Sequence, residues 1–138
     1  MSTTTPSTTA TSRPVRPTSR LYSVVIGLST LVVLLQGLWA GLFIHEGQDY
    51  QDSWVAVHAR GAEVAIALAV VATVVAFVRL RSRGDLLVGS IAFVVLLVLE
   101  AYVGGLIGDH AALTAVHLPL AMLLMGLAVW LPVRASRR

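Results

Sequence analysis

Two histidines, His58 and His117, are spaced so that both side chains could reach one cofactor site. Each follows a valine and lies five residues into an apolar segment, at about 53–78 and 112–133 respectively. The two segments are expected to run in the same direction, so at about 1.5 Å rise per residue both imidazoles should lie roughly 7–8 Å below the same end of the molecule. Two facing neutral imidazoles are suitable axial ligands for a low-spin haem iron. The spacing therefore predicts bis-histidine haem binding.

An internal repeat places polar residues near these histidines. Gln36 and Glu100 are each followed five positions later by Gly-Leu, and then by a Val-His pair that opens the next apolar segment. The ordered match predicts two similar hairpins, related by a pseudo-twofold axis along the membrane normal. Glu100 would then lie near the level of the imidazoles and could accept a hydrogen bond from one of them. A protonation site, or a protonated Glu100 that bonds between helices, is the alternative.

One arginine and a set of small residues could complete such a site. Arg60 is the only arginine outside the basic connections, and it could meet the haem propionates or pair with Glu63 three residues on. Small residues on the His58 face and at the matching depth elsewhere would leave room for a planar ring, although close packing of transmembrane helices also explains them. They are Ala62, Ala65, Ala69, Ala72, Ala121, Ala128, Gly37, Ala40, Gly41, Ala101, Gly104 and Gly105.

The elements that must position these side chains are membrane-spanning helices. Hydrophobic residues make up 57% and charged residues 12% of the 138 residues, which is far too apolar for an ordinary soluble domain. Four runs reach the roughly 20 apolar residues that a transmembrane helix needs. We therefore predict an all-α, up-down-up-down four-helix transmembrane bundle. The expected helices are about 21–44, 53–78, 86–107 and 112–133.

The distribution of charge predicts the orientation. The chain has no lysine, and nine of its ten arginines lie before the first span, between the second and third, or after the fourth. The other connections carry Glu46, Asp49, Asp52 and Asp109. The positive-inside rule then places both termini in the cytoplasm of a multi-pass cell-membrane protein. Topology, rather than nucleic-acid binding, accounts for the net charge of +3.

The segments outside the spans have simpler interpretations. Residues 1–20, rich in Thr, Ser, Pro and Arg, are predicted to be a disordered cytoplasmic tail rather than a cleaved signal peptide, because a full span follows them. Residues 134–138 are expected to form a short basic tail. His45 and His110 fall in the outer loops and are interpreted as solvated residues. Cysteine is absent, which excludes disulfides, thiolate metal sites and covalent haem attachment.

Part of the sequence resembles a known family. The segment Glu100-Ala-Tyr-Val-Gly-Gly-Leu, followed by Thr114-Ala-Val-His117-Leu-Pro-Leu-Ala-Met-Leu-Leu, resembles the histidine segments of haem A synthase. That family has two four-helix halves, each with two histidines that ligate a haem from the outer side, and roughly residues 21–133 resemble one half. The chain is also similar to a family of small, functionally unassigned four-helix membrane proteins. The resemblance implies His58 and His117 as axial ligands. The synthase's second half and its His-Arg pair are missing, so enzymatic activity is left open.

Together these patterns predict a membrane protein that binds haem b between His58 and His117, with Gln36, Arg60 and Glu100 around it. Electron transport or haem handling is the expected role. The expected partners are the lipid bilayer and a membrane redox partner or haem-handling enzyme, with no nucleic acid. Two other functions fit the same sequence. One is a small proton-coupled transporter that uses a buried carboxylate, and the other is an accessory subunit of a membrane complex.

Overall fold

The computed structural model describes residues 19–45 and 48–137, and all regular structure within them is helical. The predicted all-α, up-down-up-down four-helix bundle is confirmed. Each of the four long helices is long and apolar enough to cross a membrane, so by length and composition the chain is a multi-pass membrane protein. The elements are α1 (Arg20–His45), α2 (Gln48–Arg79), α3 (Gly84–Leu106), the short 3-10 helix η1 (Ala111–Leu113) and α4 (Thr114–Ser136).

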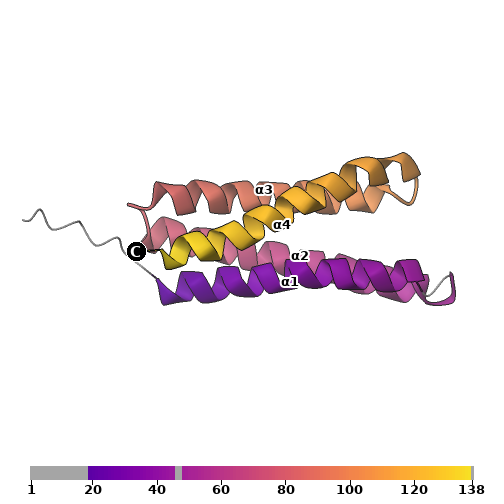
Figure 1. Cartoon of the computed structure of the whole chain (residues 1–138), viewed down its shortest axis with the longest axis horizontal. Coiled ribbons are helices and arrows are strands. Elements are labelled where there is room, and N and C mark those ends of the chain that lie inside the picture. The colour runs from indigo at the N-terminus through magenta and orange to yellow at the C-terminus, as the bar shows by residue number, and fades with distance from the viewer. Residues whose placement is uncertain (1–18, 46–47, 138) are drawn as a thin grey trace, which may run out of the picture.

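The four helices are arranged as a square in which sequence neighbours are also spatial neighbours. Within the described residues α1 contacts α2 and α4, and α3 contacts α2 and α4, whereas the backbones of the diagonal pairs α1–α3 and α2–α4 make no contact. Figure 1 shows the α1–α2 and α3–α4 hairpins close together at the end that carries the C-terminus and further apart at the opposite end. We call these the basic end and the histidine end.

The observed helices begin and end a few residues away from the predicted boundaries. Helix α2 begins at Gln48, five residues before the expected start, although its span-like part still begins at Ser53. Helix α4 continues to Ser136, so it includes part of the predicted basic tail. Hydropathy marks the length of helix that lies in hydrocarbon, and polar residues can continue the same helix beyond it. The predicted disordered tail falls almost wholly on residues 1–18, outside the described residues.

The buried core occupies the basic half of the bundle. Helices α1 and α3 bury side chains as far as Val33 and Glu100, and α2 and α4 bury residues only from Gly61 and Leu124 onward. Beyond these four positions, towards the histidine end, no described helical residue is buried. The fully buried apolar residues, all in the basic half, are Tyr22, Ile26, Ala65, Ala69, Ala72, Ala76, Phe93, Ala128 and Leu131.

Hydroxyl groups join the helices across this core. The Ser29 hydroxyl donates to the Ala65 carbonyl of α2 over 3.0 Å, and the Thr30 hydroxyl reaches the Ala128 carbonyl of α4 at 2.7 Å. The Tyr22 hydroxyl crosses the bundle to the Ser90 hydroxyl of α3, 2.8 Å away. Because lipid offers these hydroxyls no partner, such bonds between transmembrane helices contribute about 1 kcal/mol each. The bonds of Ser29 and Thr30 fix α1 to its neighbours α2 and α4 near the middle of the bundle.

Candidate functional site

His58 is half-buried on α2 and is held by the preceding helix. Its Nδ1 lies 3.2 Å from the backbone carbonyl oxygen of Gln36. A carbonyl oxygen can only accept a hydrogen bond, so Nδ1 is the protonated nitrogen and Nε2 is the basic one. The contact therefore fixes both the tautomer and the direction of the ring.

His117, on α4, is held by α3 in a parallel way. Its Nδ1 lies 3.0 Å from Oε1 of Glu100, and the ring also interacts with the Glu100 backbone. The ring packs against Gly104, where an added Cβ would lie 3.0 Å from Cε1 of the imidazole. Each histidine thus contacts the polar residue that the repeat makes equivalent, Gln36 in one hairpin and Glu100 in the other.

The two imidazoles approach each other across the bundle. They come from α2 and α4, the diagonal helices whose backbones make no contact, yet they lie close enough to interact electrostatically. His58 and His117 are therefore near each other across the bundle, and their ligation of one cofactor stays a prediction. Two imidazoles on facing helices are a pair that can ligate a cofactor bound between them.

Several polar atoms around the histidines lack hydrogen-bond partners. Among the described residues, the amide nitrogen and oxygen of Gln36, both carboxylate oxygens of Glu100 and Nδ1 of His117 are buried without an aligned partner. The 3.0 Å contact between His117 and Glu100 is thus close but poorly directed. Buried unsatisfied polar groups are rare in native proteins, and they are typical of sites that bind a ligand or an ordered water.

The Gln36 amide packs with Trp39 against Gly61, where a side-chain Cβ would collide with both. Sequence reasoning did not single out Trp39 or Gly61. The position of Gly61, one helical turn after His58, was the available signal, because only a glycine lets Gln36 of α1 approach the α2 backbone this closely.

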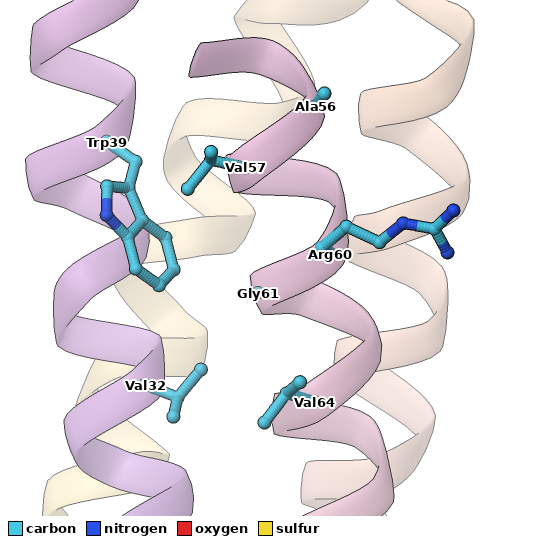
Figure 2. A pocket seen from close by; sticks show the side chains of 7 residues that line it. All are labelled: Val32, Trp39, Ala56, Val57, Arg60, Gly61 and Val64. Carbon is cyan, nitrogen blue, oxygen red and sulfur yellow. The ribbon is translucent and has the colours of Figure 1, made fainter. Parts of the chain in front are cut away.

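Arg60 lies on the outer surface of the bundle, away from the imidazoles. Its guanidinium forms a 2.8 Å ion pair with Glu63, and the two side chains are 80% and 64% exposed. Figure 2 shows Arg60 directed away from Trp39, at the edge of a shallow groove of about 400 Å³ between α1 and α2. The structure thus contains the Arg60–Glu63 pair that was one of the two expected roles, and contact with haem propionates stays a prediction.

The small residues differ in burial, and five of them are partly buried, namely Ala40, Ala62, Ala101, Ala121 and Gly104. Ala65, Ala69, Ala72 and Ala128 are fully buried, as expected for an inward face. At three glycines expected to make room near the histidines, an added Cβ would meet no atom within 4 Å. These are Gly37, Gly41 and Gly105. Of the predicted glycines, Gly104 is the one where an added Cβ would meet a histidine, and the role of the other three in making room stays a prediction.

The other two histidines fall at the edges of the outer connections, and the side chain of His45 lies outside what the structure describes. His45 is the last residue of α1, and His110 is exposed in the turn before η1. Within the part of the chain that the structure describes, no three His, Cys, Asp or Glu side chains gather as a metal-ion site. The residues that come together are therefore His58 and His117, flanked by Gln36 and Glu100.

The resemblance to one half of haem A synthase rests on the motif residues and stays a prediction. The positions of the two histidines in the structure do not depend on similarity to any other protein. Comparisons with models of known protein families, with characterised proteins and with solved structures find no match to this chain.

Proposed function

We propose that the chain binds one b-type haem between His58 and His117 and serves in electron transport or haem handling. The observation that carries the proposal is the parallel position of the two imidazoles, each with its Nδ1 beside an oxygen of the residue that the repeat makes equivalent. Nδ1 of His58 lies 3.2 Å from the Gln36 carbonyl, and Nδ1 of His117 lies 3.0 Å from the Glu100 carboxylate. Restraint of a ligand histidine through its second nitrogen is the usual arrangement at metal centres, because it orients the ring and raises the basicity of the other nitrogen.

The residues present fit a haem. Its iron needs only two protein ligands because the porphyrin supplies four nitrogens, and two imidazoles are a common pair. The site lies in the half of the bundle where no described helical side chain is buried. Bundle interiors commonly hold cofactors between side chains of facing helices. The unpartnered Gln36 amide and Glu100 carboxylate could also bond to polar groups brought by the cofactor.

Each residue would have a distinct task. His58 and His117 would hold the iron, and the Gln36 carbonyl would orient His58. Glu100 would accept a hydrogen bond from Nδ1–H of His117 and so raise the basicity of the ligating nitrogen. The haem itself would supply one-electron chemistry of its iron. A membrane redox partner, or an enzyme that handles haem, would exchange the electron or the cofactor.

The decisive test is the colour of the purified protein. Protein made with ample haem and purified in mild detergent should show a Soret band and the sharp reduced α and β bands of a six-coordinate b-type haem. The same spectrum should develop when hemin is added to protein made under haem limitation. Colourless protein that takes up no hemin would overturn the proposal.

We further propose that the basic end faces the cytoplasm, because in the sequence nine of the ten arginines fall before the first span, between the second and third, or after the fourth. Reporter fusions after Arg83 and Arg138 should read cytoplasmic, and a fusion in the 46–52 connection should read external. A cytoplasmic signal from that connection would invert the orientation and place the histidines near the inner face.

A second candidate function is proton-coupled transport. The observation that favours it is Glu100, which is 8% exposed in a span and has no aligned hydrogen-bond partner for either carboxylate oxygen. Ionisable groups inside the membrane often mark proton pathways. This function predicts colourless protein and a proton flux in proteoliposomes that Glu100→Gln abolishes. Haem-loaded protein with no such flux would eliminate it.

A further inference from the structure

The two hairpins differ at the basic end in how their charges are balanced. In the α3–α4 hairpin, the Asp85 carboxylate lies 3.3 Å from Nε of Arg83 and 2.6 Å from Nε of Arg134. Arg83 is only 2% exposed and also donates to the Arg134 carbonyl over 2.9 Å. The Asp85 carboxylate at the start of α3 therefore joins α3 to the end of α4.

The α1–α2 hairpin has arginines at this end but no carboxylate. Leu21 precedes Gln36 by the same 15 residues by which Asp85 precedes Glu100, so the repeat places a leucine where the other hairpin has its acid. Arg20 from the start of α1 and Arg79 from the end of α2 line a hollow of about 480 Å³, together with Ser19 and Leu21. No ion pair joins either arginine to an acid among the described residues, and Asp85 is the only acidic residue that the sequence places at this end.

We propose that this hollow binds the phosphate of an anionic phospholipid, which takes the role that Asp85 has in the other hairpin. Arg20 is the first residue of the α1 span, and Arg79 is the last residue of the α2 span. Their guanidinium groups would therefore lie at the depth of the lipid headgroups. Arginine matches phosphate through paired, charge-assisted hydrogen bonds. Basic pockets between transmembrane helices are known to bind anionic headgroups. The site is independent of haem binding.

The test uses the full-length protein in nanodiscs of phosphatidylcholine with a minor fraction of phosphatidylglycerol. The lipid retained after extraction is counted by native mass spectrometry. Each arginine near an anionic surface is expected to contribute about fivefold, so Arg20→Ala with Arg79→Ala should lower the preference for phosphatidylglycerol roughly 25-fold. The matched control is Arg81→Ala. Arg81 is exposed at the same end, but its guanidinium stacks over Phe77 at 4.8 Å and does not line the hollow.

A second variant keeps both arginines and therefore does not depend on the double mutant folding. Leu21→Asp supplies the carboxylate that Asp85 supplies in the other hairpin, so it should also remove the preference for phosphatidylglycerol. Equal preference in the double mutant, or an equal loss in Arg81→Ala, would overturn the proposal. Displacement of the lipid by millimolar inorganic phosphate would instead assign the hollow to a soluble anion.

Discussion

The basic and histidine halves of the bundle are built from equally apolar helices but are packed differently. In the basic half all four helices bury side chains, and hydroxyls and one carboxylate join α1 to its neighbours and α3 to α4. In the histidine half no described helical side chain is buried beyond Val33, Gly61, Glu100 and Leu124. The polar atoms of Gln36, Glu100 and His117 that lack partners lie at or next to this boundary.

The difference shows which half of the bundle is stabilised by the polypeptide's own packing and hydrogen bonds. Lipid is as apolar as a leucine side chain, so helices in a membrane associate through close van der Waals contact and polar bonds between helices. The basic half has both. The histidine half brings polar groups together without pairing them well, which is costly in a low-dielectric interior. This contrast is what a bundle would show if one half were stable by itself and the other were completed by a ligand.

Removing either histidine should have the largest effect, because it should abolish haem binding in the histidine half and leave the basic half intact. His58→Ala or His117→Ala is expected to abolish the six-coordinate haem spectrum, because each removes one axial bond. The melting temperature of the haem-free protein should change little, since neither side chain belongs to the buried core. His110→Ala is the matched control and should leave the spectrum unchanged. If His110→Ala or His45→Ala lost the haem while the first two variants kept it, the ligands would lie at the membrane surface.

Asp85→Asn should act on the basic half alone. It leaves Arg83, 2% exposed, without its carboxylate, and breaking a buried pair in this way costs about 3 kcal/mol. Denaturation in detergent should show this loss, whereas the haem content of the folded protein should stay the same. Glu63→Gln, which breaks the exposed pair with Arg60, provides the comparison and should have little effect. Equal destabilisation by both variants would contradict the assigned role of Asp85.

Gly104→Ala should weaken the histidine site without removing a ligand. The added Cβ would lie 3.0 Å from Cε1 of His117, so the ring must move. Disturbing the support of a metal ligand lowers affinity about tenfold or more, which hemin titration would measure. Gly105→Ala, one residue further along the same helix, meets no atom within 4 Å and should bind hemin normally. A similar loss in both variants would indicate a general effect on α3.

Glu100→Gln should have the smallest effect. The amide keeps the size of the side chain but removes the negative charge beside Nδ1 of His117. The haem should be retained, and its reduction potential should rise by about 50 mV, close to a tenfold change in the one-electron equilibrium. Potentiometric titration measures the shift. An unchanged potential would show that the carboxylate is already neutral or does not act on the ligand.

The sequence predicted the bundle well because hydropathy and charge record topology directly. It also led us to expect His58 and His117 near each other, since the repeat fixes their depth along parallel helices, and the two imidazoles are close enough to interact electrostatically. It could not predict that Gly104, rather than its neighbour Gly105, packs against His117. A helix in lipid is apolar on its outward side as well as its inward side, so hydropathy does not record its rotation about its own axis.

The sequence also did not reveal the cluster of Arg83, Asp85 and Arg134 at the basic end, for a related reason. Arg83 was counted only as one of the arginines in the connections, because charge near a span usually reports orientation. Its burial depends on Asp85 and Arg134, which are close only after α3 and α4 have packed. Neighbours brought together by packing in this way leave no local pattern in the chain.

The hydroxyl bonds of Ser29 and Thr30 have a mechanical consequence. They attach α1 to α2 and α4 near its middle and thus form a pivot. The arm from Thr30 to His45 is about 22 Å long, so a rotation of about 5° around the pivot would move its outer end by about 2 Å. Small adjustments at the fixed half are thus amplified at the histidine end. The bundle could widen there to admit a flat ring while the packing around Tyr22 and Phe93 stayed unchanged.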